Sequence, residues 1–178
     1  MVHRTEGTSE DKRVYAVLQF DEGTEARLRG LYQTLAAQGF CGTQTKGIPY
    51  HITLGAFEPA AEAAVVRRAQ EAARTLKAFP LRLSHVGLFG LSVLFIAPAV
   101  ERELLLLRDA VAPNGGSAEA FPWEAHVTML MDAPEAVLRA VGVLAGAFAP
   151  FMAAAESIGV YEFFPERKIG VYPLLANT

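Results

Sequence analysis

Short apolar runs rich in β-forming residues alternate along the chain with longer segments whose leucines and alanines recur at helical spacing. The first run, VYAVLQF at 14–20, is bounded by charged residues and predicts a strand. The segment 21–38 has three leucines on one helical face, with Thr24 as the expected N-cap and Gly39 as the stop. By the same criteria, we expect further strands at 50–57, 81–88, 93–97, 125–131, 151–164 and 169–175, and further helices at 59–78, 101–111 and 134–148.

The predicted elements repeat in order, which indicates an internal duplication. A β-α-β-α-β unit is followed by a second one with an additional strand, and HITL at 51–54 matches HVTM at 126–129. The predicted fold is therefore α+β, with duplicated β-α-β-α-β units forming two pseudo-symmetric lobes with antiparallel sheets around a central cleft. We expect residues 14–178 to form a single bilobal domain and residues 1–13, which are polar, to be a flexible tail.

The composition is that of a compact globular protein, with 52% hydrophobic and 20% charged residues in 178. The net charge of −3 gives no broad positive field for gripping a long nucleic acid, so a small anion or the end of a strand is the expected kind of ligand. One cysteine, Cys41, cannot form an intramolecular disulfide, which favours a cytoplasmic protein. The mean hydropathy of +0.24 raises the question of a membrane span. Glycine and proline interrupt the apolar stretches 83–100 and 140–155, so we expect no membrane association. We also expect a monomer.

Two His-x-Thr motifs are the main chemical signal in the sequence. Because side chains alternate along a strand, His51 and Thr53 share one face of the first predicted strand, and His126 and Thr128 share one face of the second. Residues two apart lie about 6.6 to 6.8 Å from one another, so an imidazole and a hydroxyl can both reach one phosphate group. A single motif of this kind is weak evidence, but its recurrence in both halves favours a functional site.

A pseudo-two-fold axis would place one histidine on each side of a bound phosphorus. One neutral imidazole would then take a proton from the attacking oxygen while a protonated one donates to the departing oxygen. The threonine hydroxyls would donate to the non-bridging oxygens. The sequence leaves open which histidine is the acid and which the base.

The two motifs on a duplicated α+β scaffold resemble the 2H phosphoesterase superfamily, which includes 2′-5′ RNA ligase-like proteins and 2′,3′-cyclic phosphodiesterases. The resemblance extends from Val14 onward, although Ala125 stands where the family often has proline before the second histidine. It implies hydrolysis or formation of a phosphodiester at a ribose 2′ or 3′ oxygen, with His51, Thr53, His126 and Thr128 as catalytic residues and no metal or cofactor. The implied substrate is a nucleotide or an RNA terminus carrying a cyclic phosphate or a 2′-5′ linkage.

Three aromatic residues are weaker candidates for stacking on a base: Phe57 and Trp123, at strand ends near the motifs, and Tyr161. Packing in the core is the alternative for each of them. The sequence contains no Gly-rich phosphate loop and no cluster with the spacing of a metal site. Two other functions remain open, namely a nucleotide-binding module with slow turnover and an RNA 2′-5′ ligase that uses the same site.

Overall fold

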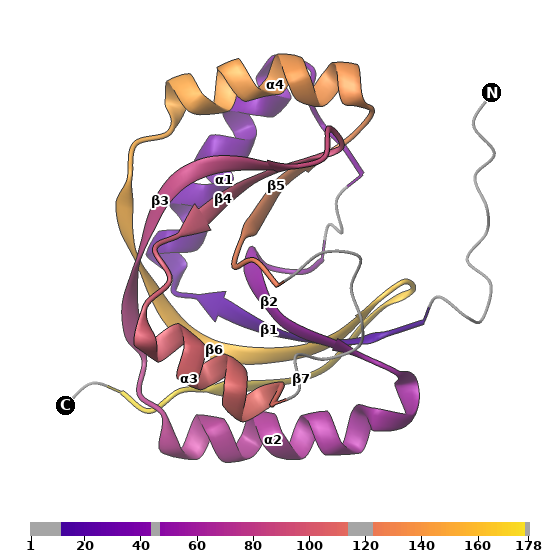
Figure 1. Ribbon diagram of the computed structural model, residues 1–178, viewed down its shortest axis with the longest axis vertical. Coiled ribbons are helices and arrows are strands. Elements are labelled where there is room, and N and C mark those ends of the chain that lie inside the picture. Colours follow the sequence, from indigo (N-terminus) through magenta and orange to yellow (C-terminus); the bar gives the residue numbers. More distant parts are fainter. Residues whose placement is uncertain (1–11, 44–46, 114–122, 177–178) are drawn as a thin grey trace.

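The computed structural model describes residues 12–43, 47–113 and 123–176, so most of the predicted tail at 1–13 lies outside the described residues. The predicted order of strands and helices is confirmed (Figure 1). The strands are β1 (Val14–Phe20), β2 (His51–Phe57), β3 (Phe79–Phe89), β4 (Val93–Pro98), β5 (Val127–Met131), β6 (Phe151–Phe163) and β7 (Glu166–Pro173). The helices are α1 (Glu22–Ala37), α2 (Glu62–Thr75), α3 (Arg102–Val111), α4 (Pro134–Ala147) and the short 3-10 helix η2 (Pro59–Ala61).

The N-terminus of α1 differs from the sequence expectation. Asp21 is the N-cap, and its carboxylate accepts a hydrogen bond from the backbone N–H of Thr24 at 3.0 Å. The Thr24 hydroxyl instead accepts a hydrogen bond from the backbone N–H of Ala154 on β6, at 3.2 Å. Thr24 was therefore the wrong choice of cap, because a contact with β6 occupies its side chain. The predicted stop is confirmed, since Gly39 has a φ of 85°, a conformation that favours glycine.

All pairings between the strands are antiparallel, in the order β2-β1-β6-β3-β4-β5, with β7 beside β6. Exchanging β1 with β4, β2 with β5 and β3 with β6 leaves this order unchanged when it is read from the other end. This is the strand arrangement that a duplicated β-α-β-α-β unit would give. Two separate sheets were expected, but pairing of β3 with β6 joins the two halves into one continuous sheet.

The sheet curves so strongly that its two ends approach one another. Helices α1 and α4 lie together at one side of the molecule and α2 and α3 at the opposite side (Figure 1). Strands β2 and β5 stand at opposite ends of the strand order, yet some of their Cα atoms lie within 8 Å of each other. The curvature thus brings the two motif-bearing strands together. No helix in the described part of the chain is long and apolar enough to cross a membrane.

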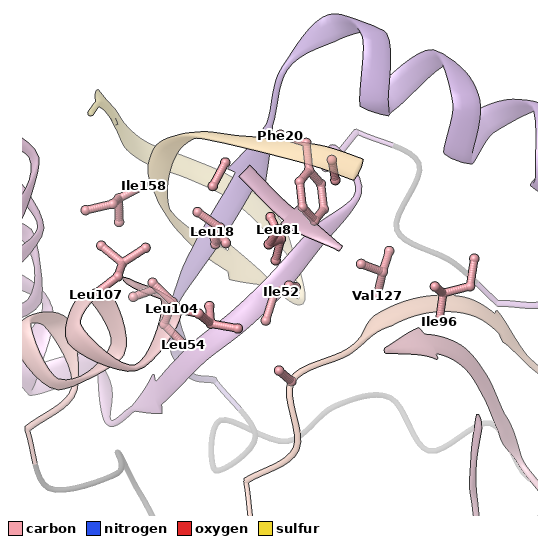
Figure 2. Packing of buried hydrophobic residues seen from close by; sticks show 14 of the residues in the cluster. Leu18, Phe20, Ile52, Leu54, Leu81, Ile96, Leu104, Leu107, Val127 and Ile158 are labelled. Atoms are coloured by element: carbon pink, nitrogen blue, oxygen red, sulfur yellow. The ribbon is translucent and has the colours of Figure 1, made fainter. Parts of the chain in front are cut away.

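The helices cover the apolar faces of the strands and leave the motif faces to polar groups. In β2, Ile52 and Leu54 are fully buried, and Leu104 and Leu107 of α3 lie beside Leu54 (Figure 2). Full burial of a leucine or isoleucine contributes about 1.5 to 3 kcal/mol, and a shift of register by one residue would expose this set. The apolar alternation therefore fixes which face of β2 presents the histidine.

Candidate active site

The four motif residues are half-buried, whereas their neighbours on the opposite strand faces are fully buried. His51 is the first residue of β2, and Thr53 shares its face. His126 lies one residue before β5, and Thr128 lies within that strand. The second histidine was expected inside the strand, but the strand begins at Val127. The alternation predicted for both motifs is confirmed by the complete burial of Ile52 and Val127.

Both histidine rings are oriented by the same backbone contact. Nδ1 of His51 lies 2.8 Å from the carbonyl oxygen of Pro49, and Nδ1 of His126 lies 2.7 Å from that of Glu124. In each motif the carbonyl belongs to the residue two positions before the histidine. Because a carbonyl oxygen only accepts, Nδ1 must carry the proton in both rings. This tautomer makes Nε2 the atom that can exchange a proton with a ligand.

The environments of the two rings differ. The hydrogen bond of His51 is partly buried, whereas that of His126 is exposed. Burial is the largest effect on His51 and lowers its pKa from 6.5 to about 4. The hydrogen bond to Pro49 acts in the opposite direction, and the charge of His126 lowers the pKa further. His51 is therefore neutral at pH 7, and its Nε2 can accept a proton.

The threonine hydroxyls complete the polar face. Among the described residues, neither the Thr53 nor the Thr128 hydroxyl has a hydrogen-bond partner, so both can donate to a ligand. The approach of β2 and β5 places the two motifs at neighbouring edges of the curved sheet. The polar face of each motif thus offers one imidazole and one hydroxyl, with a proton acceptor at His51.

Aromatic rings that the sequence reasoning missed flank both histidines. The ring of Phe163, on β6, lies 5.3 Å from that of His51. Phe89, on β3, meets the His126 ring edge-on at 4.7 Å, and Phe95, on β4, lies 5.3 Å from it. Distances are between ring centroids. The sequence does place Phe89 and Phe163 at the ends of predicted strands, but only the curvature of the sheet brings those ends to the histidines.

A buried polar network lies on the same side of the sheet as His51. Gln19, on β1, is paired in register with His51 and is only 5% exposed. Its amide nitrogen donates to the Tyr161 hydroxyl at 2.7 Å, and its amide oxygen accepts from the Ser157 hydroxyl at 3.1 Å. The signal in the sequence was a lone amide in the otherwise apolar strand VYAVLQF. The network fixes the amide orientation beside the first histidine.

The structure places the three predicted stacking residues in other contacts. Phe57 belongs to the hydrophobic core with 8% exposure, and the Arg68 guanidinium lies 5.3 Å from its ring centroid. Tyr161 is 3% exposed, and its ring packs against Gly159 while its hydroxyl serves the glutamine network. Neither ring offers an exposed face to a base in this conformation, because protein atoms cover both.

Trp123 is half-buried and has contacts on two sides. Its indole Nε1–H donates to the carbonyl oxygen of Thr53 at 2.9 Å, and the Arg108 guanidinium lies 4.4 Å from the ring centroid. One face and one edge of the ring are thus occupied by protein. Within the part of the chain that the structure describes, no group of three or more His, Cys, Asp or Glu side chains could hold a metal ion.

A comparison with known families matches most of the chain. Residues 17–163 match the model of the 2′-5′ RNA ligase superfamily. The chain belongs to that superfamily. The match confirms the resemblance to 2H phosphoesterases inferred from the two motifs. A comparison with curated protein sequences gives no match.

Solved structures share the superfamily fold. A protein described as a phosphoesterase has a TM-score of 0.62 at 19% identity, covering 92% of this chain and 99% of its own. LigT of E. coli, solved with 3′-AMP, has a TM-score of 0.60 at 18% identity, covering 92% and 98%. TT0787 of Thermus thermophilus has a TM-score of 0.62 at 15% identity, covering 93% and 100%. At these identities the likeness shows the fold, and it confirms the predicted α+β class.

Proposed function

We propose that this protein is a metal-independent phosphoesterase that hydrolyses 2′,3′-cyclic phosphates or 2′-5′ phosphodiester linkages of nucleotides or RNA ends. The observation that carries the proposal is the matched pair of histidines, each fixed as the Nδ1–H tautomer by the carbonyl two residues before it. Such a pair can supply a base on one side of a phosphorus and an acid on the other. Membership of the 2′-5′ RNA ligase superfamily and the solved LigT complex with 3′-AMP support a substrate of this class.

The lowered pKa of His51 assigns the base role to that residue in this proposal. Neutral His51 takes a proton from water through Nε2, and the water oxygen forms a bond to phosphorus. The bond from phosphorus to one ribose oxygen breaks, and protonated His126 gives its proton to that oxygen. The product is a nucleoside 2′- or 3′-monophosphate, and the two histidines have exchanged their protonation states. Proton transfer with water restores them.

Thr53 and Thr128 hold the phosphate during this reaction. Each hydroxyl donates to a non-bridging oxygen, whose negative charge increases as the water oxygen adds to phosphorus. These hydrogen bonds strengthen in the transition state, so the threonines act mainly on kcat. If the 5′-hydroxyl of a second nucleotide takes the place of water, His51 removes its proton, the 5′ oxygen bonds to phosphorus, and the bond to the 3′ oxygen breaks as His126 gives that oxygen a proton; the 2′-5′ linkage that results is the ligase product.

The test is hydrolysis of a panel of substrates in the presence of EDTA: 2′,3′-cyclic nucleotides, 2′-5′ dinucleotides and RNA ending in a cyclic phosphate. His51→Asn and His126→Asn keep a donor for the carbonyl two residues back and remove Nε2. Each should lower kcat by about 100- to 10,000-fold. His85→Asn is the matched control, because His85 is an exposed histidine on β3 that belongs to neither motif, and it should keep wild-type activity.

The outcomes separate the candidate functions. Full activity of either motif variant would contradict the two-histidine mechanism, and loss of wild-type activity in EDTA would contradict metal independence. Binding of a nucleoside monophosphate with no turnover of any substrate would favour a binding module. Thr53→Val and Thr128→Val should each lower kcat by about 100-fold, since each loses one donor to the transition state.

A further inference from the structure

The carbonyl oxygen of Thr53 has a side-chain donor from a distant part of the chain. Strand β2 is the last strand of the sheet order, so no strand of the described sheet covers its outer edge. The indole Nε1–H of Trp123 donates to the Thr53 carbonyl oxygen at 2.9 Å. A half-buried carbonyl needs such a partner, because an unpaired one would lose its hydration without compensation.

This one hydrogen bond connects the two motifs. Its acceptor, Thr53, is part of the first motif, and its donor lies three residues before His126. The residue after Trp123 is Glu124, whose carbonyl accepts the Nδ1–H that orients His126. The backbone of the first motif is therefore linked to the segment that holds the second histidine.

The indole ring is itself fixed from a third element. The guanidinium of Arg108, on α3, lies 4.4 Å from the Trp123 ring centroid, a favourable cation–π geometry. Helix α3 packs against β2 through Leu104 and Leu107, which are fully buried. The Trp123 ring and strand β2, which carries the acceptor carbonyl, are thus both in contact with helix α3. This restricts the direction in which the N–H can point.

We propose that Trp123 is a positioning residue that sets the separation and orientation of the two His-x-Thr motifs. The proposal rests on the proposed function, since in-line displacement needs both Nε2 atoms at fixed places around one phosphorus. Misplacement of a reacting group by about 1 Å can cost about 100-fold in rate. The role differs from stacking on a base, which would use the ring face and would affect substrate binding.

The first test is Trp123→Phe, which keeps an aromatic ring beside Arg108 and removes the N–H. We expect kcat for a 2′,3′-cyclic nucleotide to fall about tenfold while KM changes by less than about twofold. Tyr32→Phe is the matched control, because it also keeps a ring and removes one side-chain donor to a carbonyl, that of Cys41 at 2.8 Å. The control should keep the wild-type kcat. A wild-type kcat in Trp123→Phe, or a change in KM alone, would overturn the proposal.

A second measurement needs no substrate, because the chain has one tryptophan and hence one indole N–H signal in heteronuclear NMR. In the wild type this proton should exchange slowly with solvent, and in Trp123→Phe the titration of His51 should move toward 6.5 as the motifs separate. Rapid indole exchange, or an unchanged His51 titration, would overturn the proposal even if no phosphodiesterase activity were found.

A third variant covers the case in which Trp123→Phe does not fold. Arg108→Met retains the indole N–H and removes the cation that holds the ring. Indole exchange should accelerate and kcat should fall about threefold. Accelerated exchange with an unchanged kcat would contradict the positioning role, because the hydrogen bond would then be loosened without effect on the reaction.

Discussion

Acidification should destabilise the wild-type protein more than a variant that lacks the His51 imidazole. Burial lowers the pKa of His51 from 6.5 to about 4, so the folded protein disfavours the charged ring that the unfolded chain accepts freely. As the pH falls below 6.5, the unfolded state binds a proton that the folded state does not. The free energy of unfolding must therefore decrease, until the folded state also binds the proton near pH 4.

The size of this effect follows from the pKa difference. Each pKa unit corresponds to about 1.36 kcal/mol, so a shift from 6.5 to about 4 amounts to about 3 kcal/mol when the pH has fallen well below 4. At pH 5 the unfolded histidine is almost fully charged and the folded one almost fully neutral. About 2 kcal/mol of stability should be lost between pH 7 and pH 5. Because the His51 ring keeps some contact with solvent, these values are upper bounds.

The matched variant is His51→Asn, whose side-chain amide can still donate to the Pro49 carbonyl but does not titrate. Urea unfolding at pH 7, 6 and 5 gives the free energy of unfolding of both proteins. Other titrating groups contribute equally to both proteins and cancel when the free energy of unfolding of the variant is subtracted from that of the wild type. This difference should fall by about 2 kcal/mol between pH 7 and pH 5. The His85→Asn variant, which keeps the His51 imidazole, should lose stability between pH 7 and pH 5 as the wild type does. A difference in unfolding free energy between the wild type and His51→Asn that stays constant from pH 7 to pH 5 would refute the argument.

Three further outcomes are expected. The acidic limb of the kcat/KM profile should lie near pH 4, since protonation of His51 removes the base; a limb near 6.5 in a pH-rate titration would contradict its role. Burial also raises the pKa of Glu25 to about 7, so the folded protein disfavours the charged carboxylate that forms as the pH rises from 5 to 8. The melting temperature of Glu25→Gln should therefore increase relative to that of the wild type over this range, and a difference in melting temperature that does not change with pH would contradict this reasoning. Gly159→Ala should lower stability by about 1 to 3 kcal/mol in urea unfolding, because the added Cβ would lie 2.4 Å from the Tyr161 ring and 3.0 Å from the Gln19 amide carbon; wild-type stability would show that the network can move aside.

Local patterns in the sequence were sufficient for most elements. The run VYAVLQF has β-forming residues between charged ends, and β1 covers the same seven residues. In the first motif, Ile52 and Leu54 alternate with His51 and Thr53, which is enough to assign the two faces of β2 before the structure is known. The recurrence of the same pattern at 126–129 then predicted a paired site. These predictions succeed because they depend on neighbours within a few residues.

Long-range contacts decide the features that the sequence could not predict. No residue pattern within β3 indicates that this strand pairs with β6 and so joins the two halves of the chain into one sheet. The hydroxyl of Thr24 would suit an N-cap, but Ala154 on β6 donates to it. The rings at 57, 123 and 161 were recognised as aromatic, whereas their partners come from elements more than ten residues away in the chain. The type of a side chain limits the contacts that it can make, but the fold determines which of these contacts forms.

The difference between the two histidines is of the same long-range kind. Each motif contains the same local hydrogen bond, in which the carbonyl two residues before the histidine accepts from Nδ1–H and fixes the tautomer of the ring. Local repetition alone would make His51 and His126 equivalent, and either one could then be the base with the other as the acid. Burial at His51 favours the neutral ring, while the hydrogen bond of His126 is exposed to solvent. A duplicated motif can therefore supply two matched geometries, and burial at His51 then favours that ring as the base in the proposed reaction.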